Sequence, residues 1–420
     1  MKPLYRIDFK ALGRVASTIH RLDHFSILGF MPAMRKNVFI LAMCQALAMS
    51  GASMVLTATA VAGQILAPEK ALVTLPLAMQ FLVTMCSTIP ASLFMARVGR
   101  RIGFTVGQSV GMLGAAISAY AIYAGDFWLF VLGGGILGVH NSFWQYYRFA
   151  AADIADEDYR PKAISYVMAG GIVAAFLGPQ LAKWTYDLSA ATYSATYVAI
   201  VCLSFATVAL LQFINIPKPV VSSLSGSGRP ILEIIRTPVF IVAAMSSTIG
   251  YGVMNMLMTS TPLAMVFCGF AFNEAATVIQ WHIVGMFLPS FFTGHIIKRF
   301  GVINVIGAGA IIQSLAVAIA LSGIDFANFW FGLVLLGLGW NFMFIGGTTL
   351  LTGAYAPEER AKTQAAHDFM VFGLVAITAF SSGVLHETLG WVAVNLIAVV
   401  PIFFVFVSVI WYRNYTRNSA

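Results

Sequence analysis

The side chains of this chain that could do chemistry are polar residues set inside long apolar stretches. Asn141, Gln145 and Arg148 recur at helical spacing, so in one continuous helix they share a face. A charge at the centre of a membrane helix costs about 2.5–3.5 kcal/mol and normally faces a partner or a water-filled cavity. Arg148 could therefore bind an anionic group, or neutralise a carboxylate that takes up protons. The alternative is an arginine that extends towards the end of its helix.

Other apolar stretches carry further polar residues. Histidine titrates near physiological pH, so His282 could carry protons, or it could stay neutral and line a cavity. Asn255 and Asn341 could face a cavity or hydrogen-bond neighbouring helices. Trp144, one of several aromatic residues close to Arg148, could stack on a flat ligand or simply pack. We predict a binding site from Gln45, Asn141, Trp144, Gln145, Arg148, Asn255, Gln280, His282 and Asn341, with His282 and Asp153 as candidates for proton coupling.

The composition indicates which elements position these residues. Of the 420 residues, 59% are hydrophobic and 10% charged, and the mean hydropathy is +0.85, whereas soluble chains carry about 25% charged residues. Apolar runs of about 20 residues, enough to cross a hydrocarbon core of about 30 Å, recur along the chain. We predict an all-α polytopic membrane protein with twelve transmembrane helices, at residues 37–61, 72–95, 102–123, 127–150, 163–186, 191–214, 238–262, 275–297, 302–322, 327–352, 364–385 and 390–411.

The placement of the positive charges predicts the topology. A net charge of +8 would suggest nucleic acid as the partner of a soluble protein. With the N-terminus inside, however, every Lys and Arg except Lys70, Lys183 and Arg148 falls on the cytoplasmic side. This asymmetry follows the positive-inside rule. We expect a multi-pass protein of a bacterial inner membrane, with both termini cytoplasmic and no nucleic-acid partner.

The two halves of the chain repeat each other. Asn341 follows Asn141 at an offset of 200, and the Val-Phe-Ile of residues 38–40 returns at 239–241. Between the halves, the polar segment rich in Gly, Ser and Pro is typical of a flexible linker. The predicted organisation is a cytoplasmic arm (1–36), a six-helix bundle (37–214), a cytoplasmic linker (215–237), a second six-helix bundle (238–412) and a cytoplasmic tail (413–420).

The loop after the second predicted helix carries a recognisable motif. Residues 92–101, SLFMARVGRR, resemble the loop signature of the major facilitator superfamily, G-x-x-x-D-R-x-G-R-R. Arg97, Gly99 and the two final arginines match, whereas Ser92 replaces the first Gly and Ala96 replaces the Asp. Residues 294–301, GHIIKRFG, form the weaker second copy that this family carries between helices eight and nine.

The resemblance implies two pseudo-symmetric six-helix bundles and secondary transport by alternating access around a site near the bilayer midplane. The family pattern also implies an inner gate, in which acids at the end of helix four pair with the arginines of the signature. Because Ala96 removes the acid of the signature itself, the usual charge relay is in doubt. The predicted gate consists of Arg97, Gly99, Arg100, Arg101, Asp153, Asp156, Arg299, Gly301 and Asp368.

The sequence leaves the direction of transport open. Gly178-Pro179 at the end of a glycine-rich run partly resembles the antiporter signature of drug-efflux members, although Gly-Pro also serves as a simple bend. We expect proton-coupled transport of a small organic solute by a monomer, with export slightly favoured. The alternatives are uptake of a nutrient such as a vitamin or siderophore, and a transporter-like sensor or assembly protein.

Enzymatic and metal-binding patterns are missing from the sequence. It contains no Walker loop that would bind ATP, no zincin pair and no GxSxG elbow. The four cysteines are scattered and show no metal-ligand spacing. We therefore expect neither enzymatic activity nor a cofactor or metal.

Overall fold

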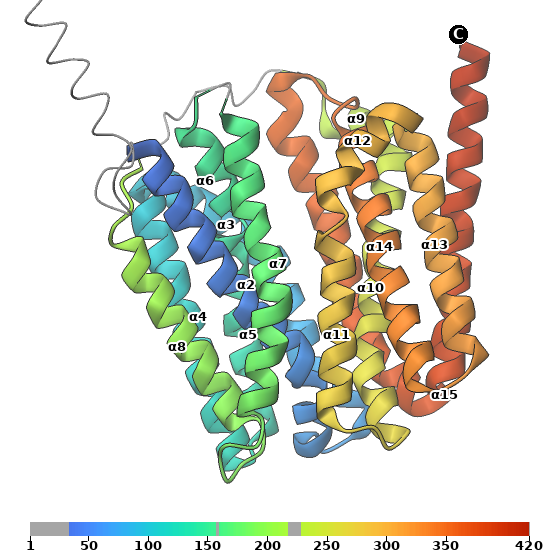
Figure 1. The fold of residues 1–420 in the computed structure, drawn as a ribbon. Coiled ribbons are helices and arrows are strands. Elements are labelled where there is room, and N and C mark those ends of the chain that lie inside the picture. Colours follow the sequence, from blue (N-terminus) through green and yellow to red (C-terminus); the bar gives the residue numbers. More distant parts are fainter. Residues whose placement is uncertain (1–32, 157–158, 217–227, 420) are drawn as a thin grey trace, which may run out of the picture.

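The computed structural model describes residues 33–156, 159–216 and 228–419 (Figure 1), and within these ranges every regular element is a helix. The predicted arm up to residue 32 and the middle of the predicted linker, 217–227, lie outside the described residues. The elements are α2 (Ala33–Leu66), η1 (Lys70–Leu72), α3 (Leu75–Val98), α4 (Arg100–Ala124), α5 (Phe127–Trp144), α6 (Tyr147–Ile154), α7 (Arg160–Thr185), α8 (Ser194–Leu211), α9 (Ile231–Ile235), α10 (Pro238–Phe267), α11 (Phe272–Phe287), α12 (Ser290–Phe300), α13 (Val302–Ser322), α14 (Phe326–Leu351), η2 (Pro357–Glu359) and α15 (Arg360–Ser419).

The described helices accommodate twelve membrane-crossing segments. Ten are long and apolar enough to span a bilayer, and α11 with α12 form a further span that is bent by 42°. α15 contains 60 residues and would be about 90 Å long if it were straight, three times the thickness of the hydrocarbon core. Gly390, with φ 76° and ψ 176°, interrupts it and separates two spans.

Two helices that the sequence predicts as continuous are interrupted. α5 ends at Trp144 and α6 begins at Tyr147, so Gln145 lies in a turn and Asn141 and Arg148 belong to different helices. Both turn residues keep right-handed helical dihedral angles, and residues 127–154 form one membrane span, so the shared face expected for these three residues stays a prediction. The predicted helix 275–297 breaks at Pro289, because proline lacks the N–H of the helical ladder and its ring collides with the preceding turn.

The helices pack as two groups with matching contacts. In the first group, α2 to α8, α2 packs on α7, α3 on α5 and α4 on α5; in the second, α10 to α15, α10 packs on α15, α11 on α14 and α13 on α14. Figure 1 shows the first group in blue and green beside the second in yellow and red. Across the boundary, α3 contacts α15 and α7 contacts α11. The equivalent helices of each group thus meet the other group.

Glycine occupies the same corner in both groups. Gly99 ends α3 with φ 91°, and Gly301 ends α12 with φ 84°. Side chains with a Cβ rarely adopt this backbone conformation. The glycines of the two loop motifs therefore have a conformational role, apart from any part in a gate.

Residues 97–101, 298–299 and 360–362 lie at one end of the helices, which we call the basic end. The two groups are joined at the opposite end. Lys70 Nζ lies 3.7 Å from Glu387 Oε1, and Lys183 Nζ donates to Thr277 Oγ1 at 2.7 Å. The Phe272 ring packs between Tyr186 and Tyr193 at centroid distances of 4.9 and 5.1 Å. At the basic end, Arg97, Arg101, Lys298 and Arg299 are exposed. These contacts close the boundary between the two groups at the end opposite the basic end.

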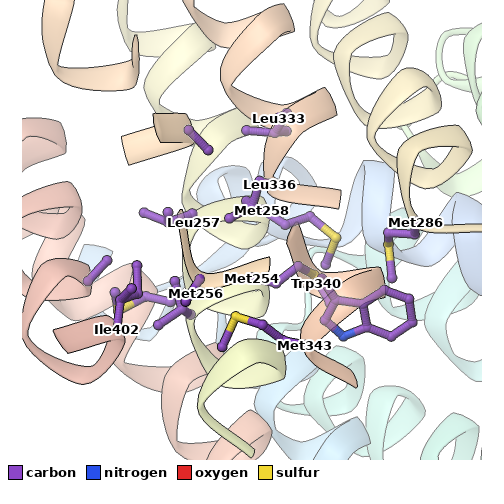
Figure 2. Close-up of a cluster of buried hydrophobic side chains, with 14 of the residues drawn as sticks. Met254, Met256, Leu257, Met258, Met286, Leu333, Leu336, Trp340, Met343 and Ile402 are labelled. Carbon is purple, nitrogen blue, oxygen red and sulfur yellow. The ribbon is translucent and has the colours of Figure 1, made fainter. Parts of the chain in front are cut away.

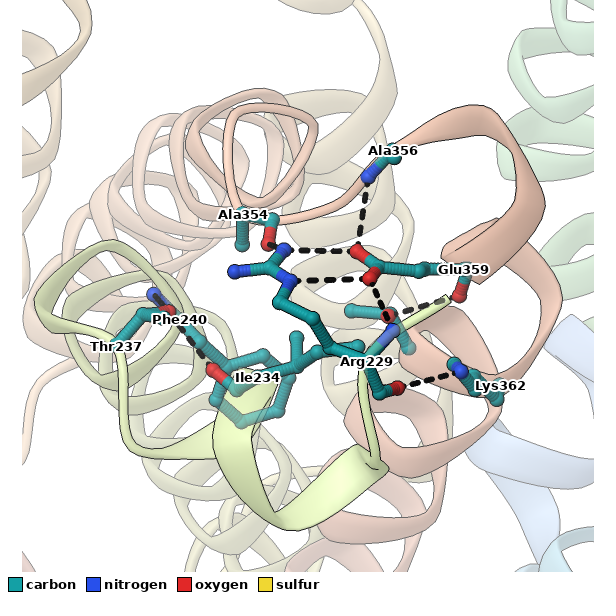
Figure 3. Close-up of polar contacts among 9 residues, drawn as sticks. Arg229, Ile234, Thr237, Phe240, Ala354, Ala356, Glu359 and Lys362 are labelled. Carbon is teal, nitrogen blue, oxygen red and sulfur yellow. Dashed lines mark hydrogen bonds and ion pairs between the residues drawn. The ribbon is translucent and has the colours of Figure 1, made fainter. Parts of the chain in front are cut away.

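A polar clasp fixes the start of α15 (Figure 3). Glu359 is 2% exposed, and its carboxylate accepts bonds from Arg229 Nη2 at 2.7 Å, Arg229 Nε at 3.0 Å and the backbone N–H of Arg229 at 2.7 Å. Lys362 Nζ donates to the Arg229 carbonyl at 2.6 Å. Gly228 has φ 105°, and a Cβ there would lie 2.6 Å from Glu359 Cγ. The chain just before α9 is therefore anchored to the helix that carries Asp368.

We expect Glu359→Gln to weaken the clasp and to remove part of the acid sensitivity of the fold. The Arg229 guanidinium first, and then the backbone N–H groups of Ala356 and Arg229, lower the pKa of Glu359 from its usual 4.5 to about 2. Because the folded-state pKa is depressed, this stabilisation is complete above pH 4.5 and is lost as the pH falls towards 2. Thermal unfolding across this window should show a loss of stability in the wild type that is smaller in Glu359→Gln. The control is Glu358→Gln at the exposed neighbouring position, and equal acid sensitivity of Glu359→Gln and wild type would contradict the prediction.

Candidate functional site

Aromatic side chains from four helices meet inside the second group. The rings of Trp340 and Phe344, one turn apart on α14, stack with centroids 5.0 Å apart and an interplanar angle of 10°. Tyr251 of α10 lies 5.4 Å from Trp340 and 5.5 Å from Phe344. Phe372 of α15 adds an edge-on contact to Tyr251 at 6.2 Å, and Phe287 of α11 one to Trp340 at 6.1 Å. We call these five residues the aromatic cluster.

The aromatic cluster lies at the boundary between the two groups. Tyr251 and Phe344 pack against both large buried hydrophobic clusters, one drawn mainly from the second group and the other from both groups, as does Leu56 of α2. Phe287 faces Gly171 of α7, where a Cβ would lie 3.3 Å from its ring. All members except Trp340 are only partly buried. The cluster therefore presents aromatic surface towards the first group.

Methionine side chains lie next to Trp340. Met254, Met286 and Met343 belong to the same buried hydrophobic cluster as Trp340, and Figure 2 shows them close to its indole ring. The thioether of methionine is flexible and polarisable, and it makes favourable contacts with aromatic rings. This bed can adjust to small shifts of the indole while it remains apolar.

Two polar atoms, one within the aromatic cluster and one two turns along α11 from Phe287, have no hydrogen-bond partner among the described residues. They are Trp340 Nε1, a donor, and Gln280 Oε1, an acceptor, and both are buried. Gln280 lies seven residues before Phe287 on α11, so the two share a face of that helix. A buried polar atom without a partner is costly. The site can therefore offer stacking surface and single hydrogen bonds to a flat ring with polar edges.

Asn255 and Asn341 are satisfied within the second group. Asn255 donates to the Val375 carbonyl at 3.2 Å and to Thr378 Oγ1 at 3.3 Å. Asn341 is fully buried: it accepts from Thr293 Oγ1 at 2.6 Å and donates at 2.7 Å to the Met286 carbonyl and to Ser290 Oγ. These bonds join α10 to α15 and α14 to α11 and α12, which fits the helix-packing alternative, and a place for Asn255 and Asn341 in the binding site stays a prediction.

His282 is also inside the second group. Its ring is fully buried, with Nδ1 2.7 Å from the Leu333 carbonyl of α14, and its Nε2 has no partner among the described residues. The α11–α14 contact beside it is close, because a Cβ on Gly337 would lie 2.5 Å from the His282 carbonyl. This location fits a helix-packing role better than the proton coupling expected from the sequence.

The predicted residues of the first group lie in separate places. Asn141 Oδ1 accepts from Trp144 Nε1 at 3.1 Å. Asn141 also lines a small pocket inside this group, together with Gln80 and His140. Gln45 is buried on α2 at its contact with Gly170 of α7. Gln145, in the turn before α6, is half-buried.

Arg148 lies on α6, which packs on α7 and α2 of the first group. Its guanidinium covers the Phe149 ring at 4.8 Å, and its Nε is buried without a partner among the described residues. Asp368 and Phe372 are one helical turn apart on α15, so Asp368 lies one turn from the aromatic cluster.

The gate residues are divided between a paired and an exposed set. Arg100 NH2 and Asp153 Oδ2 form an ion pair at 3.0 Å, and the Arg100 guanidinium lies over the Tyr146 ring at 5.7 Å. Arg101 bonds Gln212 at 3.3 Å. Arg97, Asp156, Arg299 and Gly301 are exposed, and Asp368 contacts His367 Nδ1 at 3.1 Å. The Arg100–Asp153 pair holds α4 to α6 within one group, and a gating role for the set stays a prediction.

Comparison with known proteins identifies the family. A family model described as "Major Facilitator Superfamily" matches residues 38–281. The chain belongs to the major facilitator superfamily. It is 40% identical over 368 residues to the riboflavin transporter RfnT of Brucella anthropi, covering 86% of this chain and 92% of that protein. It is also 26% identical over 343 residues to the uncharacterised transporter YddS of Bacillus subtilis, covering 77% of this chain and 78% of that one.

Solved transporters share the fold. A bacterial homologue of the human lysosomal transporter Spinster, in an inward-facing and occupied conformation, superposes with a TM-score of 0.69 at 15% identity, covering 93% of this chain and 98% of that one. The nucleoside transporter NupG gives 0.68 at 15% identity, with coverage of 88% and 99%. The chain is therefore a multi-pass membrane transporter of a small solute rather than an enzyme.

The aromatic cluster of this transporter is absent from the site predicted by sequence. Polar residues within spans are rare and attract attention, whereas aromatic residues make up 13% of this chain. The sequence signal that could have pointed to the cluster is Trp340, which immediately precedes Asn341, with Phe344 one turn further along the helix. No three His, Cys, Asp or Glu side chains come together to hold a metal ion in the part of the chain that the structure describes.

We expect Asn341→Leu to lower the stability of this superfamily member without changing its substrate preference. The substitution removes the bonds of Asn341 to the Met286 carbonyl, Ser290 Oγ and Thr293 Oγ1 in a buried site, which costs about 1–3 kcal/mol. Thermal unfolding in detergent should show the loss, while the ratio of initial rates for two substrates stays constant. The control is Asn304→Leu, an exposed asparagine on α13. A changed substrate ratio would instead assign Asn341 to the binding site.

Proposed function

We propose that this transporter carries riboflavin, or a closely related flat heterocycle, in the direction of uptake. The supporting observation is the aromatic cluster at the boundary between the groups, together with 40% identity to a riboflavin transporter over most of both chains. Stacking on an aromatic side chain contributes about 1–3 kcal/mol per heterocyclic ring. Uptake is favoured over the export expected from the sequence, because a vitamin is consumed inside the cell.

The orientation proposed for this function follows the charges. We place the basic end in the cytoplasm of a bacterial inner membrane, because the loops at that end carry the excess of Lys and Arg. With the groups joined at the opposite end, we expect access to the aromatic cluster from the cytoplasmic side in this conformation. Labelling of a single cysteine at Lys298 only after the membrane is made permeable would support this orientation, and labelling of intact cells would contradict it.

Purified transporter in proteoliposomes tests the substrate. Vesicles preloaded with unlabelled riboflavin should accumulate external labelled riboflavin by exchange, and empty vesicles without protein should not. Competition then separates the parts of the ligand: the flat ring without its sugar-alcohol chain should compete, whereas ribitol should not. If riboflavin shows no exchange and does not raise the unfolding temperature, which a ligand of the folded state must do, the proposal is wrong.

Proton coupling requires a titrating group that faces the boundary between the groups. The two candidates from the sequence do not meet this requirement, because His282 is enclosed between α11 and α14 and Asp153 is bound to Arg100. Coupling to protons therefore stays a prediction. In the same vesicles, a pH gradient with the more acidic solution outside should drive net accumulation of riboflavin in addition to exchange.

A further inference from the structure

A small pocket lies inside the first group, between α2, α3, α5 and α8. It offers about 10 Å³ to the centre of a water-sized molecule, and a buried water needs about 10–15 Å³ measured in this way. Apolar side chains such as Leu137 and Ile200 form most of its wall. Four polar residues complete the wall: Gln80, His140, Asn141 and Ser204. The size and the mixed wall indicate a small polar ligand.

Gln80 is held at this pocket by a close crossing of α3 and α5. A Cβ on Gly138 would collide with the Gln80 carbonyl oxygen, and Thr84 Oγ1 lies 2.7 Å from the Gln80 carbonyl and 3.0 Å from that of Gly138. Gln80 is 4% exposed, and its Oε1 is buried with no hydrogen-bond partner among the described residues. A buried acceptor without a partner destabilises the folded state. This atom therefore calls for a ligand that donates a hydrogen bond.

Asn141 and Ser204 bring further polar atoms to the pocket. Asn141 Oδ1 accepts from Trp144 Nε1 at 3.1 Å, and because an indole N–H only donates, this bond fixes the orientation of the Asn141 amide. Its Nδ2 makes no hydrogen bond within the part of the chain that the structure describes, and neither does the hydroxyl of Ser204, which is 5% exposed. His140 is used elsewhere, because its Nδ1 lies 3.1 Å from the Gly107 carbonyl. The pocket thus brings together an acceptor, a donor and a hydroxyl.

We propose that the pocket is a binding site for one water molecule that bonds Gln80, Asn141 and Ser204. The water donates one hydrogen to Gln80 Oε1 and the other to Ser204 Oγ, and it accepts from Asn141 Nδ2. Three bonds are what a buried water typically makes, and the ligand must both donate and accept to satisfy all three groups. The water joins α3, α5 and α8 at one point. The proposal does not depend on the substrate of the transporter.

Two serine substitutions give a matched test. Ser204→Ala should lower the unfolding temperature, because it removes one bond of the water. The control is Ser118→Ala: Ser118 is also a buried serine inside a helix of the first group, its Oγ has no partner among the described residues, and it does not line the pocket. The gain in helix propensity from serine to alanine is shared by both variants. Ser118→Ala should therefore be neutral or stabilising, and equal shifts of the two variants would overturn the proposal.

The sign of a second substitution distinguishes a bound water from a dry pocket. If Gln80 Oε1 had no partner, Gln80→Met would replace an unpaired acceptor by an apolar chain of similar length and would raise the unfolding temperature or leave it unchanged. With the water bound, Gln80→Met should lower the unfolding temperature. The double variant with Ser204→Ala should then lose less than the sum of the single shifts, since both substitutions act on the same molecule. A raised temperature for Gln80→Met, or additive shifts, would contradict the proposal.

A high-resolution structure of the wild type decides the question even if a variant fails to fold. A density peak within about 2.5–3.0 Å of Gln80 Oε1 is expected. A map that shows other buried waters but no peak at this position overturns the proposal. Crystals under xenon pressure give an independent answer, because xenon enters dry apolar cavities. Exclusion of xenon from this pocket is expected, and xenon bound there would show that the pocket is dry.

Discussion

Replacing Trp340 by leucine is expected to lower kcat/KM for riboflavin about ten- to hundredfold. The indole stacks on Phe344 and contacts Tyr251 and Phe287, so it is the central ring of the aromatic cluster. The indole supports the partly exposed rings of Phe344 and Tyr251, and loss of one stacking contact removes about 1–3 kcal/mol, where each 1.4 kcal/mol corresponds to a factor of ten. Initial rates in proteoliposomes measure the effect. Tyr251→Leu should show a smaller decrease in the same direction, because its ring lies at the edge of the stacked pair.

The controls for this prediction separate binding from folding. Trp411→Leu removes a tryptophan that is 43% exposed on the outer part of α15, and it should transport as wild type. Trp340→Phe keeps an aromatic face and should recover most of the activity. Unfolding temperatures show whether each variant is folded. Wild-type kinetics for folded Trp340→Leu would remove the aromatic cluster from the substrate path.

The second large effect is expected at a glycine where α5 crosses α3. A Cβ on Gly134 would collide with the carbonyl oxygen of Pro76, and that atom belongs to the backbone, so it cannot rotate away. Overpacking of this kind costs about 1–3 kcal/mol or more. This exceeds the benefit of about 1 kcal/mol that alanine has over glycine within a helix. Gly134→Ala should therefore reduce the unfolding temperature and the yield of folded protein.

The adjacent glycine provides the matched control. A Cβ on Gly135 would meet only Val83 Cγ2, at an ordinary contact distance of 3.7 Å. Gly135→Ala should therefore be neutral or slightly stabilising, although it is the same substitution one residue away on the same helix. Thermal unfolding of both variants decides the matter. Similar behaviour of the two would mean that α5 and α3 can separate without cost.

The sequence by itself determined the class and the family of this protein. Hydropathy is a local property, so apolar runs predict spans before any packing is known, and the described helices accommodate the twelve segments. The loop motif around Gly99 and its second copy at Gly301 resemble the signature of the family. Their glycines can be recognised from the sequence because a helix corner with positive φ favours glycine. The repeat between the halves follows from the same local signals.

Only the tertiary structure decided which side chains meet. A polar residue inside a span must find a partner, but the sequence does not show how each helix is rotated against its neighbours. In the packed structure, Asn255, His282 and Asn341 each form hydrogen bonds between helices of the second group. A turn after Trp144 places Arg148 and Asn141 in different helices. The aromatic cluster comes from four helices distant in the chain, so only the packing of these helices brings its rings together.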